Sequence, residues 1–239
     1  MANEPQRSIT IVIPVHNEAS FLPGALPQLF EEMAKVAGAD ISVLIVENGS
    51  ADGTGDLVRA AMETISNLDI IELPDPNYGA AMRQGFLAST SEWVVNFDID
   101  YFSGAFLSQA LALVDEADIV LASKRAEGSD DQRGFVRRFA TWTFNQVLRF
   151  ALGSSVSDTH GMKLVRREVV DQIVPKVIST VDLFDTELVV RAEKAGFRIA
   201  ELPASVVELR EAKSNLLKRV PRTLKGVWRI RAALRSEDR

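Results

Sequence analysis

The chain has 239 residues, 46% of them hydrophobic and 25% charged, which is ordinary for a soluble protein and is enough for one well-buried α/β domain or for one domain with a modest extension. The absence of cysteine excludes disulfides, thiolate nucleophiles and cysteine metal sites, and the presence of two histidines disfavours a zinc site built from imidazoles. The net charge of −6 argues against a general nucleic-acid binder. A metal ion would therefore be held mainly by oxygen, which points to Mg²⁺ or Mn²⁺.

The N-terminus carries no pattern of a targeting signal. Glu4 and Arg7 lead directly into a strand-like run at 9–15, with no apolar h-region or cleavage site. No apolar stretch approaches the roughly 18–20 residues that span a bilayer. We therefore expect a cytoplasmic protein.

Buried strands alternate with helices in the first half of the chain. Continuous apolar runs predict strands at 8–15, 41–46, 68–73, 93–97 and 118–123. Helical spacing of apolar residues predicts helices at 18–36, 52–65, 79–87 and 103–114. This alternation predicts an α/β fold whose mostly parallel sheet is covered by helices on both faces.

The second half is less regular. It predicts helices at 135–152 and 184–195 and short strands at 162–165 and 197–202, with Gly196 ending the second helix. No clear linker interrupts the pattern. We expect one domain over 1–210 and a helical extension over 211–239.

Polar residues follow the first four predicted strands, where ligands bind in open α/β sheets. They are His16-Asn17-Glu18, Glu47-Asn48-Gly49-Ser50, Asn77-Tyr78-Gly79 and Asp98-Ile99-Asp100. All four segments would lie along one edge of the sheet, so the predicted site lies there.

The Asp98-Ile99-Asp100 segment has two explanations. Two carboxylates two residues apart at a strand end can both turn toward a cation that bridges a diphosphate. Alternatively, Asp100 caps the helix that follows it, since Asp is a favoured N-cap residue. The tripeptide alone leaves both open.

The other strand-end segments are also open to two interpretations. Pro14 and Glu18 flank a turn that suits a nucleotide, but Glu18 could equally complement the dipole of the next helix. Glu47 or Asn48 could hydrogen-bond a base edge, or the segment could simply be a turn.

The segment that begins at Asn77 could bind phosphate. Gly79 would allow close backbone approach to a phosphate at a helix N-terminus. Arg83 could reach the same anion or be a solvated surface arginine.

In this order and at this spacing, the four segments resemble family-2 glycosyltransferases with the GT-A fold. Within that family, they resemble the branch of dolichol-phosphate-mannose and polyprenyl-phosphate-sugar synthases. Further matching segments are Ala122-Ser123-Lys124-Arg125, Arg137 with Thr141, Ser157-Asp158-Thr159-His160-Gly161-Met162-Lys163 and Phe184-Asp185-Thr186-Glu187-Leu188. The resemblance runs from about residue 8 to residue 210.

The resemblance implies a role for each matching position. The residues implied to contact the nucleoside are Pro14, His16, Glu18 and Glu47. Asp98 would lie near the ribose and diphosphate, and Asp100 would hold the metal. Arg125 and Arg137 would meet phosphate charge from donor or acceptor.

Three features depart from the family pattern. Glu47 stands where relatives usually have Asp, so the base contact is longer by one methylene. Phe102 stands where the polyprenyl branch often has a metal-contacting Gln; His160 could replace it or be a loop histidine without a metal. Many relatives carry C-terminal membrane helices, and this chain shows none.

The resemblance further implies inverting transfer of a sugar from a UDP- or GDP-linked donor. A hydroxyl acceptor needs a general base, and Asp185 stands where relatives place it. Asp185 could instead be an acidic residue that complements the first turn of its helix. A phosphate acceptor, such as a polyprenyl phosphate, would need no base.

The C-terminal segment is basic and amphipathic. Residues 210–239 contain ten Lys/Arg and three Asp/Glu, a net +7, so the rest of the chain carries −13. Its apolar residues recur every three or four positions: Leu217, Val220, Leu224, Val227, Ile230 and Leu234. Such a helix over 214–235 could contact the inner membrane face peripherally, or pack on the domain or in an oligomer contact.

Two other functions compete with glycosyl transfer. A sugar nucleotidyltransferase would carry a Gly-rich, basic loop after the first strand, which residues 14–18 do not provide. A degenerate relative that binds nucleotide without turnover is favoured by Glu47 and Phe102 but opposed by the intact Asp98 and Asp100.

Overall fold

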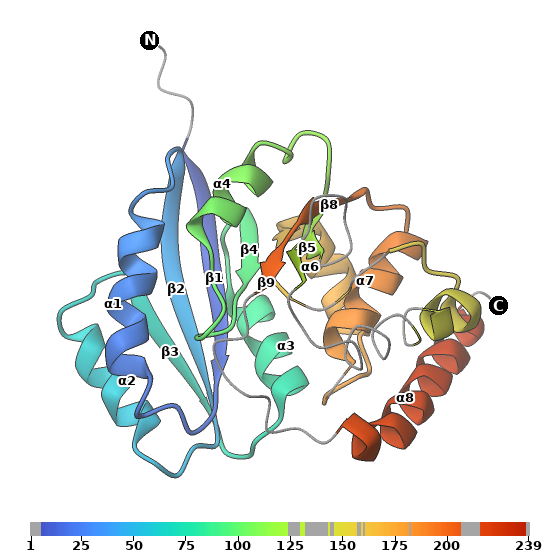
Figure 1. Ribbon diagram of the computed structural model, residues 1–239, viewed down its shortest axis with the longest axis horizontal. Helices are drawn as coiled ribbons and strands as arrows, with labels where there is room; N and C mark the ends of the chain where they lie inside the picture. Colours follow the sequence, from blue (N-terminus) through green and yellow to red (C-terminus); the bar gives the residue numbers. More distant parts are fainter. Residues whose placement is uncertain are drawn as a thin grey trace.

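The computed structural model describes residues 6–123, 130–131, 143, 146–156, 159, 161–181, 183–206 and 216–237. A seven-stranded sheet in the order β3-β2-β1-β4-β7-β5-β8 runs through the molecule (Figure 1). Its strands are β1 (Arg7–Val15), β2 (Ala39–Asn48), β3 (Leu68–Leu73), β4 (Trp93–Asn96), β5 (Ile119–Ser123), β7 (Lys163–Arg166) and β8 (Ile199–Pro203). Two short strands, β6 (Asp130–Asp131) and β9 (Ser205–Val206), pair separately.

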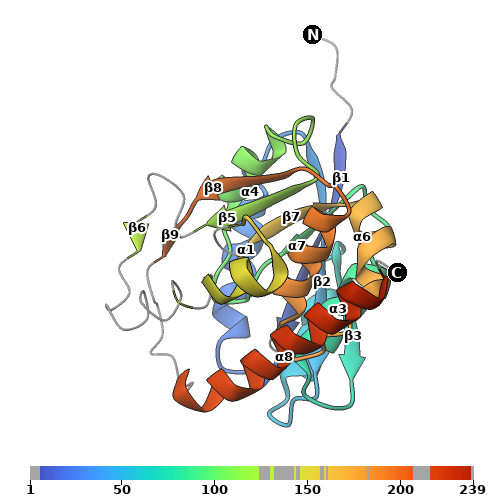
Figure 2. The same ribbon diagram turned by 90° about the vertical axis from the view of Figure 1, so that its right-hand side faces the viewer.

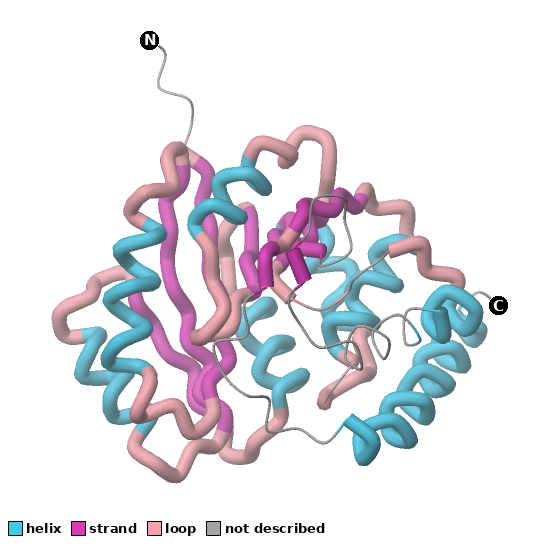
Figure 3. Tube along the Cα trace, viewed as in Figure 1, coloured by secondary structure: helices cyan, strands magenta, loops and turns pink. Residues whose placement is uncertain are grey.

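The predicted mostly parallel α/β sheet is confirmed. Strands β1, β2, β3 and β4 pair in parallel, as do β5 and β8, whereas β7 runs antiparallel to both of its neighbours, β4 and β5. Because β1 and β2 run side by side in one direction, the loops that follow them emerge at one edge of the sheet (Figure 3).

Helices cover both faces of the sheet. They are α1 (Leu22–Met33), α2 (Thr54–Met62), α3 (Tyr78–Ala88), α4 (Gly104–Leu111), α6 (Arg167–Ile173) with the 3₁₀ turn η1 (Val174–Lys176), α7 (Phe184–Lys194) and α8 (Leu216–Glu237). Helix α1 begins later than the predicted residue 18. Residues 18 and 19 instead donate their backbone N–H groups to the side chains of Thr54 and Asp52. Helix α7 ends as expected, with Gly196 at a φ of 86°.

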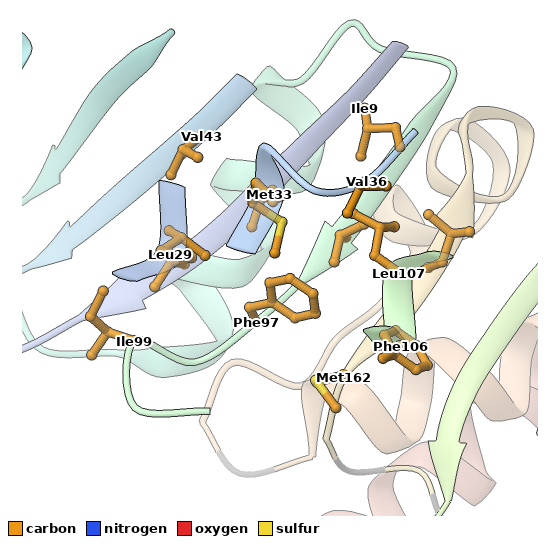
Figure 4. Packing of buried hydrophobic residues seen from close by; sticks show 14 of the residues in the cluster. Ile9, Leu29, Met33, Val36, Val43, Phe97, Ile99, Phe106, Leu107 and Met162 are labelled. Carbon is orange, nitrogen blue, oxygen red and sulfur yellow. The ribbon is translucent and has the colours of Figure 1, made fainter. Parts of the chain in front are cut away.

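Alternate residues of β1 enter two different cores. Ile9, Ile11 and Ile13 pack with α1 and α4 on one face, while Val12 packs with α3, α6 and α7 on the other. Figure 4 shows the first of these cores, where Phe97 lies among side chains from the helices and the strands. Both faces of the sheet are therefore buried in hydrophobic cores, as the continuous apolar runs indicated.

Helix α8 packs on the domain through part of its apolar stripe. Val227, Ile230 and Leu234 are buried in a third cluster with Leu148, Leu152, Leu183 and Val190. Figure 2 shows α8 lying beside α7 and the yellow helical segment 146–152. For these three positions the domain-packing alternative holds, and they are not available to a membrane. The predicted boundary at 210–211 lies outside the described residues.

Among the described residues, no helix combines the length and the apolar character that crossing a bilayer requires.

Candidate functional site

The Asp98-Ile99-Asp100 segment is held in place by apolar neighbours that are buried in the hydrophobic core. Phe97 and Ile99 are 1% and 3% exposed, whereas Asp98 is exposed and Asp100 half-buried. The Asp98 and Tyr101 backbones exchange hydrogen bonds of 3.2 and 2.9 Å, which close a tight turn. Alternation between inward apolar and outward acidic side chains therefore presents both carboxylates from a rigid base; Figure 4 shows Phe97 and Ile99 in the core.

The helix-cap explanation of Asp100 is wrong. Helix α4 is capped by Ser103, whose Oγ accepts a hydrogen bond of 3.1 Å from the backbone N–H of Phe106. Phe102 lies between them and packs against the core. The cap requirement is thus met without Asp100, and a metal-ligand role for this carboxylate stays a prediction.

The first two strand-end loops are joined by hydrogen bonds. His16 Nδ1 lies 2.8 Å from the carbonyl oxygen of Asn48. Asn17, in the left-handed region at φ 54°, accepts from the backbone N–H of Ala51 at 2.9 Å and donates its own N–H to Ser50 Oγ at 2.9 Å. These predicted donor-site loops are therefore one connected structure.

Asp52 fixes the turn that holds Glu18. Its carboxylate accepts from the backbone N–H of Ala19 at 3.0 Å and from the N–H of Thr54 at 3.1 Å. The hydrogen bond from the Thr54 hydroxyl lowers the pKa of Asp52 below its usual value. The Thr54 hydroxyl in turn accepts from the Glu18 N–H at 2.9 Å. Glu18 and Pro14 are both half-buried beside this turn.

Glu47 and Asn48 point inward and stabilise their own loop. Each is 6% exposed. Glu47 Oε1 accepts from the backbone N–H of Ser50 at 2.5 Å, and Asn48 Oδ1 accepts from the N–H of Asn77 at 2.7 Å. A role in base recognition stays a prediction for both residues.

Gly79 and Arg83 differ from their predicted roles. A Cβ on Gly79 would lie 2.6 Å from the Thr180 carbonyl oxygen, so the missing side chain makes room for segment 177–181 rather than for phosphate. The Arg83 guanidinium donates to the carbonyl oxygens of Val174, Val177 and Pro175 at 2.9, 2.9 and 3.1 Å. These carbonyls belong to η1 and its C-cap residue, where the guanidinium adds hydrogen-bond donors; the Val174 oxygen also accepts from the Val177 N–H at 3.2 Å.

Behind the Asp98 turn lies a buried network that the sequence analysis did not predict. Lys163 is fully buried and donates to Asp185 Oδ1 at 2.6 Å, Asn96 Oδ1 at 2.7 Å and the Gly161 carbonyl at 2.9 Å. The other Asp185 oxygen accepts from the Tyr78 hydroxyl at 2.8 Å. All three ammonium donors are thus satisfied, as a buried cation requires.

The network also interacts electrostatically with the turn at 98–101, which carries Asp98 and Asp100 and is called the acidic turn below. Burial raises the pKa of Tyr78 well above its usual value, and the neighbouring carboxylates of Asp185 and Asp98 raise it further. Tyr78 therefore remains a neutral donor at physiological pH. A lone lysine inside an apolar strand was the sequence signal that could have identified this network.

Asp185, the candidate general base, is buried and hydrogen-bonded to other side chains of the protein. It is 3% exposed in the first turn of α7, and its two oxygens accept from Lys163 and Tyr78. A general base must reach the proton that it removes, and this carboxylate is enclosed by its own partners. Arg125, Arg137 and His160 lie outside the described residues, so their predicted roles stay predictions.

The donor set at the acidic turn fits a divalent cation. Mg²⁺ and Mn²⁺ are commonly held by one or two carboxylates together with substrate phosphates rather than by an all-protein cage. Within the described part of the chain, no group of three or more acidic or histidine side chains is placed so that it could hold a metal ion. Metal binding by Asp98 and Asp100 stays a prediction.

The chain is similar to known glycosyltransferases over most of its length. Residues 10–174 match the family model described as glycosyl transferase family 2. An uncharacterised glycosyltransferase of Mycobacterium tuberculosis is 28% identical over 199 residues, which cover 83% of this chain and 84% of the relative. A dolichyl-phosphate beta-glucosyltransferase of Dictyostelium discoideum is 22% identical, covering 94% of this chain and 77% of its own length.

A solved structure supports the fold. Glucosyl-3-phosphoglycerate synthase from M. tuberculosis, in complex with Mn²⁺, UDP-glucose and phosphoglyceric acid, superposes with a TM-score of 0.69 at 18% identity. The match covers 96% of this chain and 81% of that chain. This likeness shows the GT-A fold.

Proposed function

Because the chain belongs to glycosyl transferase family 2, we propose that this glycosyltransferase moves a sugar from a UDP- or GDP-linked donor to an acceptor that is already anionic, of the polyprenyl-phosphate class. The observation that carries the acceptor class is the enclosure of Asp185 by Lys163 and Tyr78. The donor class rests on the family and on the acidic turn.

An ionised phosphate needs no proton removed before it attacks the sugar, whereas a hydroxyl acceptor does. Asp185 was the base candidate among the matching residues, and both of its oxygens are engaged inside the protein. This arrangement favours an acceptor that arrives already ionised. The Dictyostelium relative, named as a dolichyl-phosphate glucosyltransferase, supports the same acceptor chemistry.

On the donor side, Asp98 and Asp100 would hold Mg²⁺ or Mn²⁺. When bound, the ion supplies positive charge at the donor diphosphate. The joined loops around His16, Glu18 and Glu47 would supply a preorganised wall for the nucleoside, because hydrogen bonds within the protein fix their conformation. In-line attack at the anomeric carbon, with inversion, is the expected course.

The proposal is tested by offering matched acceptors. Purified protein is incubated with Mn²⁺ and either UDP-glucose or GDP-mannose, and with farnesyl phosphate, farnesol or 3-phosphoglycerate as acceptor. We expect sugar transfer to farnesyl phosphate and none to farnesol. Transfer to farnesol or to the hydroxyl of 3-phosphoglycerate, at rates equal to or above that for farnesyl phosphate, would overturn the acceptor class.

An Asp100→Asn variant serves as the inactive control in the same assay. If no donor is turned over by the wild type with any acceptor, while nucleotide still binds, the chain is a degenerate relative and the catalytic proposal fails.

A further inference from the structure

Two large aromatic side chains are exposed side by side on the outer surface of the α8 region. Phe150 is 82% exposed and Trp228 is 61% exposed. They come from helices far apart in the sequence and line one open groove of about 560 Å³ together with Val147, Ala151 and Arg231. Figures 1 and 2 both show segment 146–152 next to α8. Exposed aromatic groups gathered in this way usually mark an interaction surface.

This surface is distinct from the apolar stripe that α8 uses for packing. Val227 and Ile230 face the domain, whereas Leu224 and Trp228, one helical turn apart, face outward with exposures of 39% and 61%. We call Phe150, Leu224, Trp228 and Arg231 the aromatic–basic face. Its Arg231 guanidinium lies 5.2 Å from the centre of the Trp228 ring.

The charge around these aromatic groups has a single sign. From 216 to 236, α8 contains seven Lys/Arg and no Asp/Glu. Among residues 221–237 of this helix, whose side chains the structure describes, the exposed cations are Arg222, Lys225, Arg229 and Arg235. Glu237, at the end of α8, pairs with Arg191 of α7 at 2.7 Å. The exposed side of α8 is therefore positive, although the chain as a whole is at −6.

We propose that the aromatic–basic face docks on an anionic lipid surface. Trp and Phe side chains beside long basic side chains match the interfacial region of a bilayer, where rings enter the headgroup layer and cations meet lipid phosphate. Each Lys or Arg near such a surface contributes favourably, so the exposed cations elsewhere on α8 would add to the contribution of Arg231. The surface goes beyond the proposed transfer reaction, since it requires neither donor nor acceptor.

A second copy of the chain is the rival occupant, because residues outside 210–239 carry −13 and could attract this face. The membrane is favoured because the two most exposed aromatic side chains of the described surface stand out at 82% and 61%. Such protruding rings suit a deformable lipid layer.

The experiment is co-sedimentation with phosphatidylcholine vesicles, with or without about one-third phosphatidylglycerol, in low salt and at about 0.5 M NaCl to screen surface charge. We expect wild type to bind only the anionic vesicles and to be released by salt. Phe150→Ser combined with Trp228→Ser, or Lys225→Glu combined with Arg229→Glu, should each lower the partition coefficient about tenfold.

Matched controls alter α2 and the end of α1, which lie on the side of the molecule away from α8 (Figure 1). Leu57→Ser on α2 removes an exposed apolar side chain, and Lys35→Glu after α1 makes the same kind of charge change. Both should bind like wild type. Trp228 emission should shift to the blue on vesicle addition, a change that a Trp228→Phe variant lacks.

Three results would overturn the proposal. They are no binding of wild type to anionic vesicles, equal binding of the surface variants and controls, or a wild-type dimer that the Phe150 and Trp228 changes convert to monomer. Sugar transfer to farnesyl phosphate in detergent does not require vesicle binding. The transfer assay therefore tests the proposed function independently of the vesicle experiment.

Discussion

Lys163 Nζ lies 2.6 Å from Asp185 Oδ1, and the two side chains are 1% and 4% exposed. The pair joins β7 to α7, and its hydrogen bonds to Asn96 and Tyr78 extend it to β4 and α3. Four elements thus meet directly beneath the acidic turn. The pair is a positioning device for the candidate site as well as a buried ion pair.

Replacing Lys163 by Met should be strongly destabilising, by about 3–5 kcal/mol, because it leaves the Asp185 carboxylate buried without its cation. Urea unfolding of wild type and variant measures the difference. The double variant Lys163→Met with Asp185→Leu should recover a large part of the loss, since neither charge then remains. Additive losses in the double variant would show that the two residues act independently.

The Tyr78 hydroxyl should make stability depend on alkaline pH. Its pKa is raised in the folded protein, so its contribution is fully present below the ordinary value of 10.0 and is lost as pH rises through the higher folded value. Above pH 10, wild type should therefore lose stability more steeply than Tyr78→Phe. At neutral pH, Tyr78→Phe should cost about 1–2 kcal/mol, because one Asp185 oxygen loses its donor.

Denaturant curves at several pH values give both quantities. Parallel pH dependence in wild type and Tyr78→Phe would mean that the hydroxyl titrates normally.

Asp100 and Ser103 should separate ligand binding from folding. Asp100→Asn should abolish the metal dependence of nucleotide binding while changing stability by less than about 0.5 kcal/mol, because the carboxylate is not the cap of α4. Ser103→Ala should do the opposite and cost about 1 kcal/mol of stability with nucleotide binding unchanged. Calorimetry with UDP or GDP, with and without Mn²⁺, reports binding, and thermal melting reports stability. A metal dependence that survives Asp100→Asn and Asp98→Asn would remove the acidic turn from the site.

Much of the fold follows from local patterns. Strands such as β1 and β2 are buried on both faces, so they appear in the sequence as continuous apolar runs, and the position of their ends predicts which polar residues share an edge. The acidic turn could be placed for the same reason. Its helix-cap alternative depended on which residue starts α4, and helix boundaries are the part of a pattern that sequence resolves least well.

The tertiary contacts of the site could not be predicted in this way. Tyr78 and Asp185 are 107 positions apart, and Arg83 finds its carbonyl partners about 91 positions downstream. A glycine at a helix start suits phosphate and a crossing backbone equally well, and only the path of segment 177–181 distinguishes them at Gly79. The packing of α8 depends in the same way on residues from 148 to 190.

Segment 177–181 should be the most sensitive contact of α3. Glu187, which is fully buried, holds the segment by accepting from the backbone N–H groups of Ile178 and Ser179 at 3.0 and 2.8 Å. Gly79→Ala would drive a methyl group into the Thr180 backbone, which cannot yield as a flexible side chain would. We expect a loss of about 1–3 kcal/mol, the usual range for overpacking.

Gly24→Ala in α1 is the matched control, because a Cβ there meets nothing within 4 Å. It should stabilise the protein by about 0.5–1 kcal/mol, since alanine is the better helix former. If the contact with Thr180 is tight, urea unfolding should show a lower free energy of unfolding for Gly79→Ala and a higher one for Gly24→Ala, each relative to wild type. A Gly79→Ala protein as stable as Gly24→Ala would instead mean that segment 177–181 can move away from α3, which would reopen the helix N-terminus as a phosphate-binding site.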